Sequence, residues 1–69
     1  MVILQKMRER RKMTQEDLSL ASGIKQQTIS AIESGKNKHP RIDTLFALAK
    51  ALRCTVDDLI EESQETKGA

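Results

Sequence analysis

The sequence predicts a small all-α domain built from five short helices. The chain has 69 residues with one phenylalanine, no tryptophan and no tyrosine, and its interior shows no regular alternation of apolar and polar residues. Strands draw on aromatic and β-branched side chains and on that alternation, so an all-β fold is disfavoured. Apolar residues instead recur three and four positions apart, and two of the three glycines fall where helices would end.

The first predicted helix covers about residues 2–12, and a second begins at Thr14. The hydroxyl of Thr14 can accept a hydrogen bond from the backbone N–H of Asp17, whose carboxylate can reach back, so this pair predicts a capping box. Gly23 ends the second helix because glycine adopts the left-handed conformation of a helix stop without steric strain. The apolar residues that would face inward from these helices are Leu4, Met7, Leu18 and Ala21.

The third predicted helix covers about 26–34 and ends at Gly35. Ile29 and Ile32 lie three apart and define its inner face. A polar loop, 36–41, follows, and its single proline keeps the preceding residue out of helical geometry. The loop therefore separates the third helix from a fourth.

The fourth predicted helix, about 42–52, is the most apolar element and is expected to form the centre of the core. Its apolar residues keep the i, i+3, i+4, i+7 spacing of one helix face, and they are Ile42, Leu45, Phe46, Ala49 and Leu52. A second capping box, Thr55 with Asp58, opens a fifth helix at about 56–62. The residues expected to pack inward from it are Val56, Leu59 and Ile60.

We therefore expect one helical domain over 1–62 and a polar, frayed tail over 63–69. The opening Val2-Ile3-Leu4 could instead extend as the edge of a sheet. No repeat or low-complexity segment divides the chain further.

The net charge of +2 conceals an uneven distribution along the chain. The first 13 residues carry five basic side chains and one acidic one, and the loop 36–41 carries three basic side chains. The last 13 residues carry five acidic side chains and one basic one. Two basic segments with an acidic C-terminal part favour a surface that binds a polyanion, although solvated helix and loop surfaces would give the same pattern.

Residues that carry catalysis or bind metals are scarce. Cys54 is the only cysteine, so it cannot form an intramolecular disulfide or a cysteine-rich zinc site, and it is expected to be a small buried hydrophobe. His39 is the only histidine and lies in the polar loop. We therefore predict no enzyme active site, no metal site and no cofactor.

No segment predicts membrane insertion or export. The longest uncharged apolar run, Leu45–Ala49, is far shorter than the ~20 residues that span a bilayer. The apolar start of the chain is too short for a signal peptide. A free thiol without an export signal indicates a reducing compartment, so we expect a cytoplasmic protein.

The stretch 14–35 contains two short helices joined by a tight turn, which is the helix-turn-helix pattern. Gly23 permits the reversal, and apolar residues on both sides of it can meet in one small core that fixes the crossing angle. The outer face of the second helix is polar, with Lys25, Gln26, Gln27, Ser30 and Ala31. In this pattern the second helix can enter the major groove of DNA.

Longer motifs extend this pattern over about residues 3–61. They include Leu-x-x-Met-Arg at the start, Thr-Gln-Glu-Asp-Leu, Ser-Gly-Ile, Thr-Ile-Ser-x-Ile-Glu-x-Gly and Thr-Val-Asp-Asp-Leu-Ile near the end. Together they make the chain resemble the phage repressors and Cro proteins, the XRE family of helix-turn-helix DNA-binding regulators. The resemblance implies the five-helix lambda-repressor-like fold.

The resemblance also implies roles for particular residues. The positions that would read base edges are Gln26, Gln27, Thr28, Ser30 and Ala31. A glutamine amide donates and accepts together, which suits adenine N6 and N7. The positions that would bind DNA phosphates are Gln15, Lys36, Asn37, Lys38 and Arg41. Gln15 would also buttress Gln26, and Arg8 with Glu33 would form a partly buried structural pair.

Three positions depart from the family pattern. Lys25 stands at the N-cap of the third helix, where Ser or Thr is usual, and we expect a nearby DNA phosphate to compensate for the lost cap. An exposed, slightly unfavourable lysine is the alternative. Ser19 replaces a usual alanine, and it fits if its hydroxyl finds a backbone carbonyl. Ser22 replaces a larger apolar residue.

The predicted function is a sequence-specific, repressor-like regulator that binds double-stranded DNA as a homodimer on a two-fold operator. Candidates for an apolar dimer patch are Val2, Ile3, Leu59 and Ile60. No small-molecule ligand is expected. The alternative is an antitoxin or protein-interaction module that keeps the fold and binds DNA weakly. The two basic segments and Gln26-Gln27 favour the regulator, because an interaction module does not need them.

Overall fold

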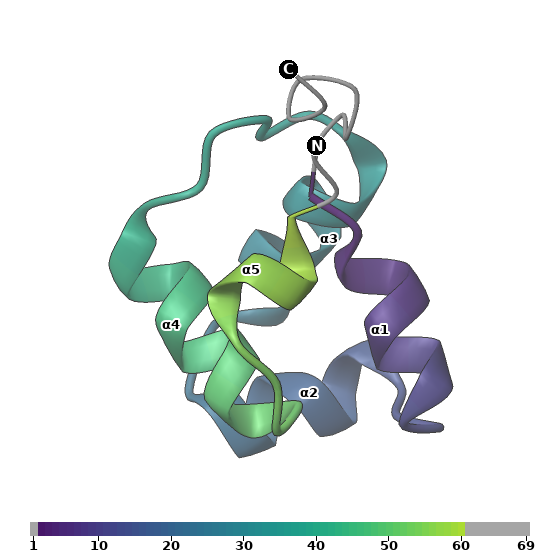
Figure 1. Ribbon diagram of the computed structural model, residues 1–69. Coiled ribbons are helices and arrows are strands. Elements are labelled where there is room, and N and C mark those ends of the chain that lie inside the picture. Colours follow the sequence, from purple (N-terminus) through teal and green to yellow (C-terminus); the bar gives the residue numbers. More distant parts are fainter. Residues whose placement is uncertain (1, 61–69) are drawn as a thin grey trace.

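The computed structural model describes residues 2–60, and this part of the chain folds into five α-helices with one short extended contact (Figure 1). The helices are α1 (Leu4–Arg10), α2 (Gln15–Ser22), α3 (Gln26–Ser34), α4 (Ile42–Ala51) and α5 (Val56–Leu59). The extended contact is a single antiparallel bridge between Val2 and Ile60. The all-helical prediction is confirmed. No helix in the described part is long and apolar enough to cross a membrane.

The helices surround one core. α2 packs against both α3 and α4, α4 packs also against α5, and α1 packs against α3. In Figure 1, α4 forms the left edge of the molecule and α1 the right edge, with α5 between them and α2 below. Ten buried side chains fill the enclosed space: Leu4, Met7, Leu18, Ile29, Ile32, Leu45, Leu48, Ala49, Leu52 and Leu59. Each large one contributes about 1.5–3 kcal/mol by leaving water, and this burial is what holds such short helices together.

Both predicted capping boxes are present. The Thr14 hydroxyl accepts from the Asp17 backbone N–H at 3.0 Å, while the Thr14 N–H donates to the Asp17 carboxylate at 2.9 Å. Thr55 and Asp58 make the same reciprocal pair at the start of α5. The N–H and hydroxyl of Thr55 lower the pKa of Asp58, since they stabilise its charged form. Gly23 ends α2 with φ +79°, in the left-handed region as predicted.

The first helix is shorter than the predicted 2–12. Val2 is extended in the bridge, and the Ile3 backbone N–H donates to the Leu59 carbonyl oxygen at 2.7 Å, so α1 begins only at Leu4. This short extended segment partly confirms the expectation of a sheet edge. Of the four residues predicted for a dimer patch, Leu59 is fully buried and is therefore not on the surface, whereas Val2, Ile3 and Ile60 are half-buried against the core of their own chain.

The C-terminal bounds also differ from prediction. α4 ends at Ala51, one residue early, and α3 matches its predicted range. α5 ends at Leu59, because Ile60 is extended and pairs with Val2. The predicted end of the fifth helix at 62 and the predicted tail over 63–69 lie outside the described residues.

The inner face of α4 was predicted incorrectly at two positions. Ile42 and Phe46 are 64% and 63% exposed, whereas Leu48 is fully buried. Because apolar residues occur on more than one side of this helix, a stripe through Leu45, Leu48 and Leu52 satisfies the spacing as well as the predicted stripe does. The contacts of α4 with α2 and α5 decide which stripe is buried.

This difference predicts contrasting stabilities for two substitutions on the same helix. Leu48→Ala is expected to lower the free energy of unfolding by about 2–5 kcal/mol, since it leaves a cavity in the core. Phe46→Ala is expected to change it by less than about 0.5 kcal/mol, since the ring lies mostly in water. Urea unfolding followed by circular dichroism measures both. A large loss for Phe46→Ala would contradict its exposed position.

Candidate nucleic-acid interface

Two serines build the turn between α2 and α3. The Ser19 hydroxyl donates to the Ile24 carbonyl oxygen at 2.6 Å, and the Ser22 hydroxyl accepts from the Ile24 backbone N–H at 3.1 Å. Gly23 lies between them in the left-handed conformation. The prediction that Ser19 is tolerated through a backbone carbonyl is confirmed. Ser19 and Ser22, the two serines that depart from the family pattern, therefore stabilise the turn that sets the angle between α2 and α3.

The outer face of α3 borders a groove of about 360 Å³. Gln26, Gln27 and Ser30 are exposed on this face, and Ala31 is half-buried beside them. The residues that line the groove are Gln15, Gln26, Gln27, Ser30, Ala31 and Lys36. We call this set the α3 groove. Four of the five side chains predicted to read bases thus meet two predicted phosphate contacts, while Thr28 is half-buried and lies outside the groove lining.

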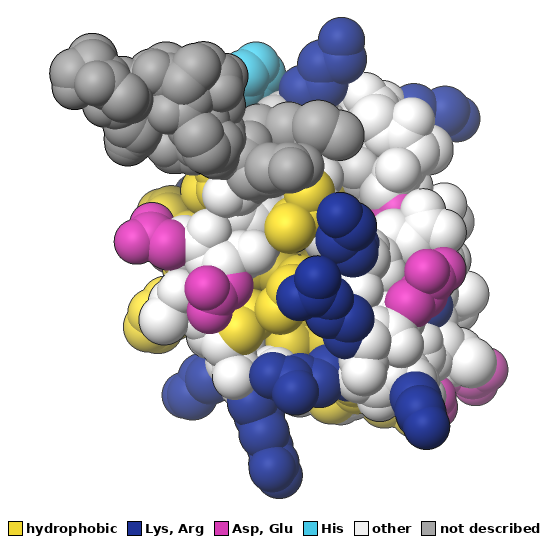
Figure 2. Space-filling model, turned by 45° about the vertical axis from the view of Figure 1, so that its right-hand side comes forward, with side chains coloured by type: hydrophobic (Ala, Val, Ile, Leu, Met, Phe, Trp, Pro, Cys, Tyr) yellow, Lys and Arg dark blue, Asp and Glu magenta, His cyan; other side chains and the backbone are white. Residues whose placement is uncertain are grey.

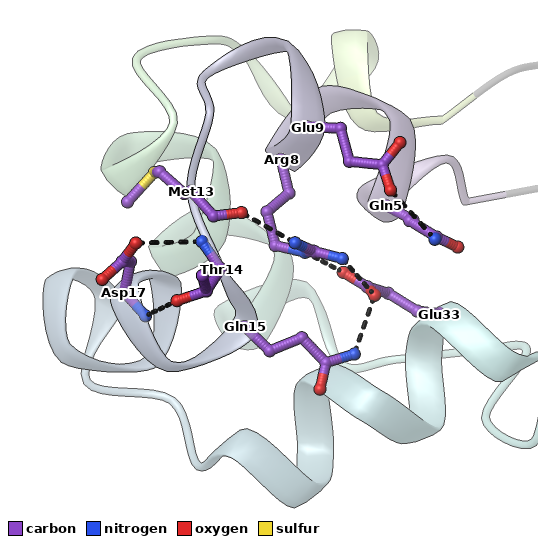
Figure 3. A network of polar contacts seen from close by, with 8 residues as sticks. All are labelled: Gln5, Arg8, Glu9, Met13, Thr14, Gln15, Asp17 and Glu33. Atoms are coloured by element: carbon purple, nitrogen blue, oxygen red, sulfur yellow. Dashed lines mark hydrogen bonds and ion pairs between the residues drawn. The ribbon is translucent and has the colours of Figure 1, made fainter.

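A polar network behind the groove joins three helices through Glu33 (Figure 3). The Arg8 guanidinium donates from Nε to Glu33 Oε2 at 2.7 Å and from Nη2 to Oε1 at 3.1 Å. Its Nη1 donates to the Met13 carbonyl oxygen at 2.7 Å. The side chains of Arg8 and Glu33 are only 11% and 5% exposed, and the hydrogen bonds to Glu33 raise the pKa of Arg8. The predicted pairing is therefore present and nearly buried.

Gln15 joins the same network. Its amide N–H donates to Glu33 Oε1 at 2.9 Å, so its hydrogen-bond partner is Glu33 and not the predicted Gln26. Figure 3 shows the amide oxygen of Gln15 turned away from Glu33. Glu33 Oε1 accepts from both Arg8 Nη2 and the Gln15 amide. The network thus holds the Gln15 side chain at the edge of the α3 groove.

The basic residues of the α3–α4 loop do not all lie together. Lys36 borders the α3 groove, whereas Asn37 and Lys38 line a separate hollow of about 590 Å³ with Val2, Ile32, His39 and neighbouring residues. Asn37 is partly engaged inside the loop, because its Oδ1 accepts from the His39 backbone N–H at 3.1 Å. Arg41 and Lys25 are exposed at the starts of α4 and α3. Lys25 makes no side-chain cap.

Of the basic residues in α1 and at its C-terminal end, some are held by hydrogen bonds to other parts of the chain and others are exposed. Figure 2, which brings the α1 side forward, shows Lys and Arg side chains beside a strip of hydrophobic side chains. Arg8 is held by Glu33, and Arg11 donates from Nε to the Leu52 carbonyl oxygen at 2.8 Å. Arg11 therefore caps the C-terminal end of α4, a role that its place in a basic segment did not indicate. Lys6 and Arg10 are exposed.

The described residues show no group of three histidine, cysteine, aspartate or glutamate side chains that could hold a metal. Cys54 is half-buried, and burial, with a smaller effect of Asp58, raises the pKa of its thiol. A protonated thiol at neutral pH is a weak nucleophile. This position agrees with the interpretation of Cys54 as a packing residue.

The buried pair predicts a non-additive effect on stability. Arg8→Met is expected to lower the free energy of unfolding by about 3 kcal/mol, because it leaves the Glu33 carboxylate nearly buried without its cation. Arg8→Met with Glu33→Leu is expected to recover most of that loss, since both charges are removed. Denaturant unfolding of the two single variants and the double variant measures the coupling. Equal losses in Arg8→Met and the double variant would show that packing, and not the unpaired charge, is responsible.

Comparison with known proteins places this architecture in a family. A family model described as helix-turn-helix matches residues 4–59. The chain is 40% identical over 60 residues to the uncharacterized HTH-type transcriptional regulator YozG of Bacillus subtilis, covering 86% of this chain and 71% of that protein. It is 34% identical over 61 residues to the uncharacterized HTH-type transcriptional regulator y4dJ of Sinorhizobium fredii, covering 88% of this chain and 78% of that protein.

A phage protein is also similar. Putative protein P2 of Acyrthosiphon pisum secondary endosymbiont phage 1 is 53% identical over 38 residues, which are 55% of this chain and 40% of the phage protein. The match thus spans less than half of the phage protein. No solved structure matches this chain significantly. The match over α1 to α5 and the two bacterial relatives show that the chain belongs to the helix-turn-helix family of transcriptional regulators.

Proposed function

We propose that this protein is a sequence-specific regulator that binds double-stranded DNA, with α3 in the major groove. The observation that carries the proposal is the α3 groove, in which two exposed glutamines of α3 stand beside Gln15 and Lys36. A major groove about 12 Å wide admits one helix, and a glutamine amide can bond adenine N6 and N7 together. The names of two relatives as HTH-type transcriptional regulators support the same class.

Each residue of the α3 groove then has a distinct task. Gln26 and Gln27 select bases, and Ser30 and Ala31 shape the surface that faces the base edges, where Ala31 can contact a thymine methyl group. Thr28 is half-buried at the margin of this surface and is the fifth position proposed to face the bases. Gln15 donates to a backbone phosphate with its remaining amide N–H, while Glu33 holds its other N–H. Contacts to phosphates fix the position of the protein on DNA but carry no sequence information.

The remaining phosphate contacts surround this surface. They come from Lys25, Lys36, Asn37, Lys38 and Arg41. The cationic side chains among them are exposed, so their charges are accessible to a DNA phosphate. A single α3 reads only a few base pairs, so we infer a homodimer on a two-fold operator. A regulator of this kind acts as a repressor when its operator overlaps a promoter.

Titration of duplex DNA at several salt concentrations tests the proposal. A duplex pool with random sequence is first selected on the protein, and the enriched duplex is used as the probe. Affinity for it is expected to fall steeply with salt, because phosphate contacts release counterions. Gln26→Ala and Gln27→Ala are each expected to lower that affinity by about 1–3 kcal/mol and to relax selection at one position.

Gln5→Ala is the matched control. Gln5 is an exposed glutamine of α1 that donates to Glu9 at 3.1 Å and lies outside the α3 groove. Its replacement is expected to leave DNA affinity unchanged. If no duplex is enriched from the random pool, the proposal fails, and an interaction module with the same fold becomes the better explanation.

Lys25 yields an opposing pair of effects. Lys25→Ser is expected to raise the free energy of unfolding by about 1 kcal/mol, because serine supplies the N-cap that α3 lacks. The same change is expected to weaken DNA binding and to reduce the salt dependence by about one phosphate contact. Thermal unfolding and salt titration measure the two effects. Unchanged affinity and salt dependence would remove Lys25 from the phosphate contacts.

A further inference from the structure

One side of α4 exposes apolar side chains that the core does not use. Ile42 and Phe46 are both more than 60% exposed, and they are four positions apart, so they lie on the same side of the helix. Asp43 and Lys50 are exposed on this side as well. We call these four residues the α4 flank. α4 lies at the left edge of the molecule in Figure 1, and all four flank side chains are exposed to solvent.

Phe46 stands between two grooves. The first, about 560 Å³, lies between α4 and the end of α2 and is lined partly by small side chains, Ala21, Ser22, Ala47 and Ala51. The second, about 480 Å³, lies between α4 and α5. A projecting ring beside a hollow of small side chains is complementary to a copy of itself, because each ring can enter the other copy's first groove. Burial of an aromatic ring in this way contributes strongly to association.

The charges on the flank have the symmetry that a two-fold contact needs. Asp43 lies three residues before Phe46, and Lys50 lies four residues after it. When two such helices pack antiparallel with their Phe46 residues adjacent, each Asp43 faces the Lys50 of the other copy. Within residues 2–60 the ion pair found joins Arg8 and Glu33, so neither flank charge is engaged there. Asp57 of α5 also borders the second groove with Lys50.

We propose that the α4 flank is the surface by which two copies of this chain associate, antiparallel along α4 with Phe46 at the centre. The α3 groove shares no lining residue with either groove beside Phe46, so the contact leaves both sets of Gln26 and Gln27 open. The inference deepens the proposed function by naming the partner surface. It rests on that function only for the two-fold arrangement on DNA.

The contact is small. α4 has ten residues and is therefore about 15 Å long. Contact along so short a helix buries less than the roughly 1,200–2,000 Å² of accessible surface that a stable interface buries. The free protein is accordingly a weak dimer whose population rises with concentration. Because charges contribute to the contact, association also weakens as salt screens them.

Sedimentation equilibrium of the chain without DNA, up to millimolar concentration at low salt, tests the surface. The wild-type chain is expected to self-associate, and Phe46→Ala is expected to raise the dimer dissociation constant at least about tenfold, as loss of a central aromatic contact does. Leu20→Ala is the matched control, because Leu20 is 79% exposed on α2 but lines neither groove. A wild-type chain that stays monomeric, or equal effects of the two substitutions, would overturn the proposal.

A mixing experiment tests the antiparallel arrangement. Asp43→Lys places two lysines on the flank and Lys50→Asp places two aspartates, so each variant alone is expected to stay monomeric. An equimolar mixture of the two is expected to form a heterodimer, because both cross-contacts then join opposite charges. Circular dichroism confirms that each variant is folded. If the mixture stays monomeric, the assigned register is wrong and the proposal falls.

These measurements contain no DNA. Failure of the association therefore leaves the DNA-binding proposal standing, and failure of DNA binding leaves the association standing.

Discussion

The arrangement of the first three helices depends on the carboxylate of Glu33. It accepts from Arg8 on α1 and from Gln15 on α2, while Arg8 also donates to the Met13 carbonyl oxygen between these two helices. A nearly buried carboxylate is costly unless its oxygens are occupied, so the network favours one arrangement of the three helices. The same contacts place Gln15 beside the exposed face of α3, which makes the proposed DNA surface a consequence of the interior.

Short helices account for the rest of the construction. Helices of four to ten residues are not stable alone, so each depends on its caps and on the shared core. Capping boxes begin α2 and α5, hydroxyls of Ser19 and Ser22 hold the turn before α3, and Arg11 caps the end of α4. These capping and turn side chains therefore determine where each short helix begins and ends.

Much of the fold could be predicted from local patterns. Two capping boxes, two glycines with positive φ and the apolar spacing of α3 act within a few residues of the chain, so the sequence indicated them correctly. The inner face of α4 could not be predicted, because two apolar stripes satisfy the same spacing. The bridge between Val2 and Ile60 and the hydrogen bond from Arg11 to Leu52 join residues far apart in the chain, so no local sequence pattern predicts them.

The sequence alone determined the helix-turn-helix, the polar outer face of α3 and the residue types that can read bases, since these follow from spacing and side-chain chemistry. Only the tertiary structure decided which polar groups meet. In the folded chain the Gln15 amide donates to Glu33 rather than to Gln26, Lys36 and Lys38 line different hollows, and Phe46 is exposed to solvent. The physical reason is that burial and hydrogen bonding between helices are settled by competition among neighbours, and those neighbours exist only once the chain has folded.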